Sequence, residues 1–358
     1  MREMMIRQDV EDVLQRTQRF NSSNKKGIAL IQVREIRSLQ RPRLKPLNRW
    51  SFPAETEAYL DAEAERALDY WEERKDLKDD QFPSLAPWFG IAEHSAFVGG
   101  NVDFSEDTSW HHPIIKDWSD LDKLELREDN VWLNMVTGGL RYLREKWGDR
   151  FLIKLRGADG PMDIANAIRG NDLFTDFFEY PDEVHRLMDF CTKAVKWTLD
   201  RQKEAAGTPG DGVISGFDVW LPGNSAGHLS EDASALCSPA IYQEFGKPYT
   251  TKLCANYDHT FVHTHALGKH SIEAIASIPH MDYIEISSDP NCSRAIEIYA
   301  GLKEKLEGKT IVLDLTREEM ENNLALLKDS KTIIWYKAEN LQDAEETVAW
   351  VRKELEAE

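Results

Sequence analysis

Short apolar runs alternate with longer stretches of helical periodicity along most of this chain. Apolar runs of four to eight residues between polar stretches are typical of buried strands. The second half of the chain shows this alternation most regularly. The strands predicted from these runs are Phe151–Leu155, Val213–Phe217, Thr260–His265, Tyr283–Ser287, Thr310–Asp314 and Thr332–Tyr336.

The stretches between these runs predict amphipathic helices. Strands that alternate with helices indicate a parallel sheet, and the chain has no glycine-rich GxGxxG turn of a dinucleotide-binding sheet. We therefore predict an α/β fold, a (β/α)8 TIM barrel with an N-terminal helical extension. The predicted helices are Leu133–Trp147, Pro181–Ala206, Pro239–Tyr257, Ser271–Ile278, Ser293–Lys305, Arg317–Lys328 and Asp343–Glu356.

The first 80 residues differ from the rest in pattern, and we predict that they form a helical extension and a tether. Residues 54–75 have helical periodicity and good helix formers. Two prolines mark the tether at Arg41–Pro46. The run from Phe82 to Ile91 predicts the first strand and its exit loop. The predicted domains are thus 1–80 for the extension and 81–358 for the barrel.

Composition narrows the classes of function. The net charge of −19 argues against binding to nucleic acid, whose phosphates require a basic face. Residues 1–50 are nevertheless basic, which predicts a solvated arm, a contact with the acidic body, or a docking surface for an anionic partner.

No apolar run is long enough to cross a membrane. The N-terminus does not resemble a secretory signal, and the four dispersed cysteines are expected to be reduced, so a cytoplasmic location is predicted.

Two histidines stand two residues apart in the run Phe261–Gly268. In a strand, His263 and His265 point to the same side, where they can hold a metal ion or act as an acid and a base. By the same alternation Glu285 points into the barrel from the next strand. The three side chains predict a catalytic zinc site with an open position. Asp289 and Cys292 are alternatives for the third ligand.

The alternative for each of these residues is a structural role. His263 can be a hydrogen-bonded core residue, and Glu285 can pair with Lys337 or Arg294 instead of a metal.

Other candidate functional residues lie in loops. Asp159 and Asp232 are candidate catalytic proton donors, with a helix N-cap as the competing role. Aromatic and imidazole side chains predict a substrate pocket for a flat, apolar molecule. These candidate substrate-binding residues are Trp88, His94, Trp110 and Trp220.

Residues from about 85 to 355 resemble the uroporphyrinogen decarboxylase superfamily, which includes corrinoid-dependent methyltransferases. The order of several motifs carries the resemblance, and it implies a barrel fold. The matching motifs are Asp107–Ile115, Gly157–Gly170, Phe178–His185, Ser238–Tyr249 and the strand that contains His263 and His265.

Departures from the family pattern shape the expected function. The decarboxylases carry an N-terminal R-Q-A-G-R loop, and neither Arg34 nor Arg37 lies in such a context. The zinc methyltransferases have H-x-C and a later cysteine, whereas this chain has His265 and no cysteine in its last strand. Imidazole and carboxylate ligands would leave zinc more Lewis acidic than thiolates do, which suits an ether or phenolic oxygen.

The resemblance therefore implies a methyltransferase that moves a methyl group from a small substrate to a corrinoid protein. A methoxylated aromatic is the expected methyl donor, so that the reaction is an O-demethylation. A metal-free decarboxylase of a smaller acid, with Asp159 or Asp232 as proton donor, is the first alternative. A non-catalytic binding barrel is the second.

Overall fold

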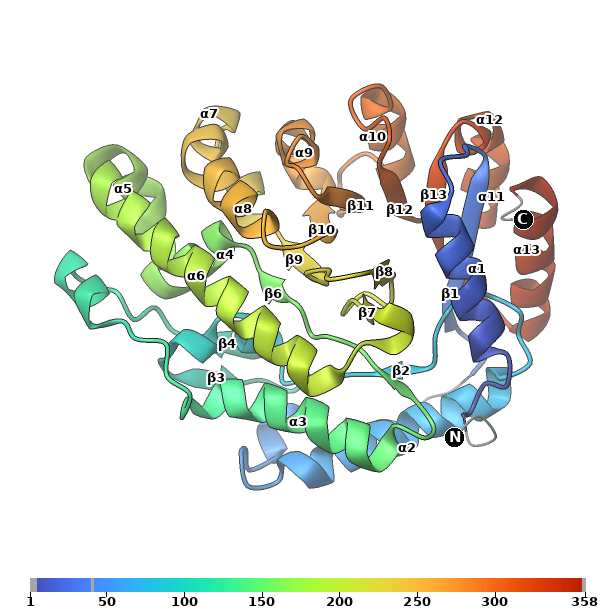
Figure 1. Cartoon of the computed structure of the whole chain (residues 1–358), viewed down its shortest axis with the longest axis horizontal. Coiled ribbons are helices and arrows are strands. Elements are labelled where there is room, and N and C mark those ends of the chain that lie inside the picture. Colours follow the sequence, from blue (N-terminus) through green and yellow to red (C-terminus); the bar gives the residue numbers. More distant parts are fainter. Residues whose placement is uncertain (1–4, 40–41, 356–358) are drawn as a thin grey trace.

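The computed structural model describes residues 5–39 and 42–355, which form a (β/α)8 barrel with strands inside and helices outside (Figure 1). Its main sheet is parallel and has seven strands in the order β1-β13-β12-β11-β10-β9-β6. This arrangement confirms the predicted fold class. The strands are β1 Ile28–Ile36, β6 Ala158–Asp159, β9 His228–Ser230, β10 Thr260–His265, β11 Met281–Ser287, β12 Thr310–Asp314 and β13 Lys331–Ala338.

A second, shorter parallel pair completes the wall of the barrel. Strand β2 (Ser84–Leu85) pairs with β5 (Leu152–Ile153), which leads directly into β6. Side-chain hydrogen bonds and one backbone hydrogen bond join β1 to the residues just before β2. We call this junction between β1 and β2 the seam of the barrel. The Asp80 N–H donates to the Ile31 carbonyl over 2.6 Å, and the Asp80 carboxylate accepts from the Ile31 N–H over 2.8 Å. The Asp79 carboxylate accepts from the Val33 N–H over 2.9 Å.

The helices cover the outside of the barrel, as Figure 1 shows. The predicted helix Pro181–Ala206 has the predicted bounds, whereas the predicted Pro239–Tyr257 and Arg317–Lys328 are each divided. The long segment after Pro239 passes through a π-helical turn at Tyr242–Gly246. The helices are α1 Val10–Ser22, α2 Thr56–Arg74, α3 Val131–Trp147, α4 Pro161–Arg169, α5 Leu173–Glu179, α6 Pro181–Ala206, α7 Pro239–Ile241, α8 Lys247–Cys254, α9 Lys269–Ala276, α10 Ala295–Leu302, α11 Arg317–Asn322, α12 Leu324–Lys328 and α13 Leu341–Glu354.

The helical prediction for the first 80 residues is wrong over Ile28–Ile36, which forms the barrel strand β1. This strand pairs in parallel with β13 along its length. One face of β1 is buried under the helices and the other inside the barrel. This burial on both faces determines the strand conformation, although the flanking residues are basic and helix-like. The two flanking segments are helical, as α1 and α2. Residues 1–4, 40, 41 and 356–358, including Arg41 of the predicted tether, lie outside the described residues.

The segment Val213–Phe217 also differs from its prediction. Strand β7 (Gly212–Ile214) pairs antiparallel with β8 (Trp220–Pro222) as a hairpin, so it does not take a place in the main sheet. The three residues of β9 take that place instead, between β6 and β10. A further antiparallel pair joins β3 (Val102–Phe104) and β4 (Ser109–His111). None of the described helices has the length and apolar character needed to span a membrane.

Candidate metal centre and cavity

Strand β10 carries both histidines to the carboxyl end of the barrel. It lies between β9 and β11, with His263 opposite Ser230 on one side and Glu285 on the other. Phe261, two residues earlier on the same face, packs inside the barrel, whereas Val262 packs against the outer helices. The period of two in a strand therefore directs His263 and His265 into the barrel, at the end where barrel enzymes place their chemistry.

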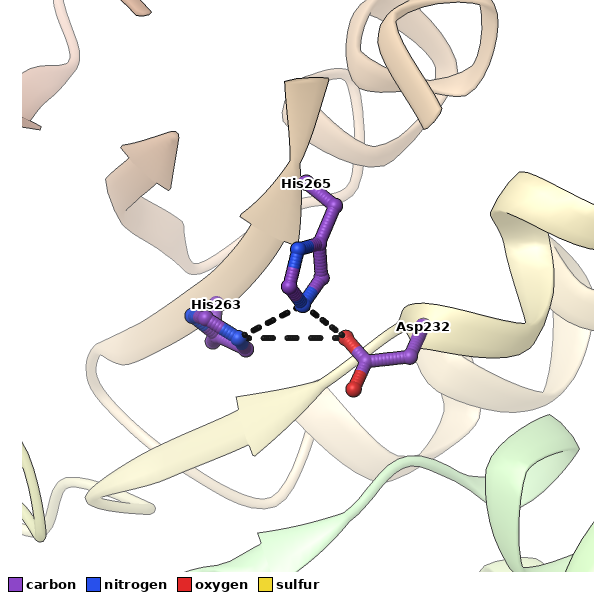
Figure 2. A group of neighbouring side chains, drawn as sticks. All are labelled: Asp232, His263 and His265. Carbon is purple, nitrogen blue, oxygen red and sulfur yellow. Dashed lines mark hydrogen bonds and ion pairs between the residues drawn. The ribbon is translucent and has the colours of Figure 1, made fainter. Parts of the chain in front are cut away.

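Three side-chain donor atoms converge at this position (Figure 2). His263 Nε2 lies 3.1 Å from His265 Nε2. Asp232 Oδ1 lies 3.5 Å from His265 Nε2 and 4.0 Å from His263 Nε2. Among the described residues, this group has the composition and spacing of a metal site, with all three donor atoms within 4.8 Å of one another.

Carboxylates hold the opposite ring nitrogen of each histidine. His263 Nδ1 lies 2.5 Å from Glu285 Oε2, and His265 Nδ1 lies 2.7 Å from Asp289 Oδ1. Each carboxylate has a second donor, since Ser287 donates to Glu285 and the Leu267 N–H donates to Asp289. A carboxylate on Nδ1 keeps the proton there and leaves the lone pair on Nε2, which is the arrangement found behind metal-bound histidines.

The third donor of the group is therefore Asp232, and not Glu285 as the sequence suggested. Glu285 lies directly opposite His263 on the adjacent parallel strand, so its carboxylate reaches only the near ring nitrogen. Asp232 begins the turn that follows β9, and this turn carries it over the strand ends. Asp289, predicted as an alternative ligand, also binds a histidine Nδ1. Cys292 is not part of the described group.

The other expected partners of Glu285 are bound elsewhere. Lys337 pairs with Asp314 over 2.5 Å, and Arg294 pairs with Glu319 over 2.7 Å. Glu285 therefore contacts His263 and Ser287 instead.

Burial lowers the pKa of His263, but the adjacent Glu285 and then Asp232 more than offset that effect, so the pKa of His263 is raised above the ordinary value.

Asp159 lies beside this group at the end of β6. Burial, and then the nearby Asp232 carboxylate, raise the pKa of Asp159 to about 7. A carboxyl group with that pKa exchanges a proton near neutral pH, as a general acid must. Asp163 has a different role, because its carboxylate accepts from the backbone N–H groups of Asp232 and Ala233 and so fixes the turn that presents Asp232.

A cavity of about 690 Å³ opens from the candidate metal centre into the barrel. Its lining is aromatic on several sides and polar at its centre. A second hollow of about 480 Å³ meets the first at Asp159 and Asp232 and includes His265. The lining residues of the larger cavity that matter here are Trp88, Trp110, His94, Phe217, His228 and Asp159.

Three of the four predicted substrate-binding residues line this cavity. Trp88 and the 55% exposed Trp110 lie at its mouth. His94 lies deeper, with Arg156 donating to its Nε2 over 2.9 Å. Trp220 does not reach the cavity: it is 3% exposed, packs with Val13 of α1, and donates through Nε1 to the Pro209 carbonyl. Its place on the β8 hairpin turns it outward, so its predicted role is wrong.

The sequence did not single out several residues of the cavity. Arg156 lies under the Trp88 ring, 4.8 Å from its centroid, and forms a buried ion pair with Glu93. Arg34, at the end of β1, also lines the cavity, although its sequence context gave no sign of it. His228 lies on a strand of three residues, too short to produce a recognisable apolar run. Arg156 stands three residues before the predicted Asp159, and this nearness in sequence was the available signal.

Comparisons with known proteins agree with this architecture. Residues 87–324 match the model of the family described as uroporphyrinogen decarboxylase. A solved structure of a methyltransferase from Methanosarcina mazei superposes with a TM-score of 0.61 at 14% sequence identity, covering 96% of this chain and 98% of that one. At that identity the likeness concerns the fold. No curated protein sequence matches the chain.

Proposed function

The chain belongs to the uroporphyrinogen decarboxylase family, and from this premise we propose that it is a metal-dependent methyltransferase. Its substrate is a small methylated compound, a methoxylated aromatic, and its methyl acceptor is a corrinoid carried by a partner protein. The observation that carries the proposal is the convergence of Asp232, His263 and His265 beside an aromatic-lined cavity.

The donor set fits zinc. Zinc bound by imidazole and carboxylate at about 2.0–2.2 Å places tetrahedral donors roughly 3.4 Å apart. The three distances between the donor atoms, from 3.1 to 4.0 Å, bracket that value. Three protein ligands leave one tetrahedral position open, as in catalytic zinc sites. Asp232, His263 and His265 are the residues that would hold the ion, which would supply Lewis acidity toward a substrate oxygen.

The remaining residues bind the substrate and control its surroundings. Trp88, Trp110 and Phe217 present flat apolar surfaces that suit an aromatic ring and exclude water from it. Glu285 and Asp289 hold the two imidazoles in one orientation, which reduces reorganisation when the substrate binds. Burial raises the pKa of Asp159, so this carboxyl group can hold a proton and donate it to an oxygen that gains negative charge.

A direct test uses free cob(I)alamin as the methyl acceptor, with 4-methoxybenzoate as donor and the zinc-loaded protein. We expect the spectrum of methylcobalamin to appear, and H265A to lose this activity because the variant lacks one of the three donor atoms. The proposal fails if a fully zinc-loaded protein methylates no cobalamin with any of a series of methoxylated aromatics.

A second function is supported by one observation, the raised pKa of Asp159 in a cavity that two guanidinium groups also line. A metal-free decarboxylase would hold a carboxylate substrate against Arg34 and Arg156 and protonate the product carbanion from Asp159. Release of carbon dioxide by the chelator-treated protein, without any cobalamin, would favour this function over methyl transfer.

A further inference from the structure

His228 lies in the inner part of the larger cavity, on β9, and has no role in the candidate metal centre. It is 2% exposed, and its ring lines the same cavity as Trp88, Asp159 and His263. The Phe217 ring meets it edge to face, with the centroids 4.7 Å apart. His94 lies on another side, 5.9 Å away between centroids. The imidazole is thus held from two directions and faces the space that a substrate would fill.

One hydrogen bond fixes the tautomer of this histidine. The backbone N–H of Gly216 donates to His228 Nδ1 over 3.2 Å. Because a backbone N–H can only donate, Nδ1 must carry the lone pair, and the proton of the neutral ring must be on Nε2. Burial, and then the neighbouring His94 and Arg156, lower the pKa of His228 well below its ordinary value, so the ring stays neutral.

Within residues 5–39 and 42–355, no side chain or carbonyl accepts a hydrogen bond from His228 Nε2. The atom is not sealed among the buried polar atoms but lines the cavity, so its acceptor must come from water or from a bound substrate. The backbone beside the imidazole leaves room for it because two of the adjacent residues are glycines. A Cβ on Gly157 would lie 2.1 Å from His228 Cε1, and a Cβ on Gly216 would lie 2.5 Å from the same atom.

We propose that His228 is a substrate-binding residue whose Nε2–H donates a hydrogen bond to the ether oxygen of a methoxylated substrate. This inference rests on the proposed methyltransferase function and assigns a residue to the recognition of its ether oxygen. An oxygen lone pair satisfies the free donor, whereas a methylammonium group offers no lone pair to it.

The test compares two ligands that differ only at the hydrogen-bond acceptor. In 4-ethylbenzoate a methylene group replaces the ether oxygen of 4-methoxybenzoate, with nearly the same shape. Calorimetric titration of the zinc-loaded protein, without cobalamin, gives the ratio of the two dissociation constants. We expect the wild-type protein to bind the methoxy compound about 3- to 10-fold more tightly, which is the range for one net hydrogen bond.

Two variants of His228 separate the hydrogen bond from the packing of the ring. In H228N the side chain can still accept from the Gly216 N–H, but it ends before the position of Nε2. In H228Q the amide group can place an N–H donor near that position. Because zinc can also favour the ether oxygen, we expect H228N to lower the wild-type ratio about 3-fold or more rather than to abolish it, and H228Q to recover most of the preference. Zinc content and the midpoint of thermal unfolding of each variant report whether the fold is retained.

The outcomes distinguish this inference from the proposed function. A wild-type protein that methylates cobalamin but binds the methylene compound as tightly as the methoxy compound overturns the role of His228 alone. The same holds if H228N keeps the full preference. If H228N does not fold, the wild-type ratio and the H228Q ratio decide the question. Absence of methyl transfer to cobalamin, with the preference intact, overturns the proposed function but not the hydrogen bond.

Discussion

The side chains behind the two histidines determine how well the candidate centre can hold a metal. Glu285 is almost fully buried, and its carboxylate contacts His263 Nδ1 and Ser287 rather than the converging donor atoms. It is therefore a positioning residue for His263. The strand alternation predicted its inward direction, but only the register between β10 and β11 shows which ring nitrogen it reaches.

Replacing this carboxylate should weaken zinc binding without removing a ligand. We expect E285Q to lower zinc affinity about 10- to 100-fold, because an amide holds the imidazole less strongly and makes its Nε2 a weaker donor. Competition with a chromophoric chelator at pH 7 measures the change. E339Q, at an exposed acid on the outer surface, is the matched control and should bind zinc like the wild-type protein. Unchanged affinity in E285Q would contradict the assigned orientation.

A glycine beside His228 gives a second prediction at this scale. Gly157 has a φ of +78° and leaves no room for a Cβ next to the imidazole. We expect G157A to lower the free energy of unfolding by about 1–3 kcal/mol, through backbone strain and displacement of the ring. Urea denaturation measures this. In α10, G301A adds a methyl group that meets no atom within 4 Å beyond its chain neighbours and its own helix backbone, and it should be neutral or stabilising. Equal stability of the two variants would show that the ring is not confined as described.

At the scale of elements, the seam between β1 and β2 is the least regular part of the barrel wall. Two fully buried carboxylates bridge it, and four arginines neutralise them. Arg7 and Arg74 each lie 2.7 Å from Asp79. Arg16 lies 2.8 Å and Arg352 2.6 Å from Asp80. The basic character of the N-terminal segment is thus partly explained, since Arg7 and Arg16 make contacts within the molecule.

Breaking this network should be costly. We expect D79N to lower the free energy of unfolding by about 3–5 kcal/mol, because it leaves the buried guanidinium group of Arg74 without a counter-charge and leaves Arg7 with Asp9 alone. Equilibrium denaturation in urea measures the loss. D103N removes an exposed carboxylate that pairs with His112 and should change stability by less than about 0.5 kcal/mol. A loss in D79N no larger than in D103N would mean that the seam does not depend on these ion pairs.

Sequence patterns predicted the regular elements better than the irregular ones. The predicted bounds of β10, β12 and α6 agree with the structure, since long apolar runs and strong helical periodicity dominate there. The apolar run of β1 was wrongly predicted to be part of a helical arm because basic residues flank it. Strands β2, β5, β6 and β9 have only two or three residues each, so tertiary pairing rather than local pattern defines them.

At the scale of the whole molecule, the barrel brings loops from distant parts of the chain to one mouth. Asp159 ends β6, Asp232 follows β9, and the histidines lie in the last half of β10. The sequence identified each of these residues separately, and the fold class predicted that they would share one end. It could not show that Asp232 completes the donor set, because the turn after β9 is held by Asp163, 69 residues away in sequence.

The central claim is that Asp232, His263 and His265 form a zinc site without sulfur ligands. Zinc X-ray absorption spectroscopy of the purified, zinc-loaded protein tests it most directly. We predict about one zinc per chain, with only nitrogen and oxygen neighbours at about 2.0–2.2 Å. The D232N, H263A and H265A variants should each lose this signal. A sulfur neighbour at about 2.3 Å, or a wild-type protein that retains no zinc, would contradict the account.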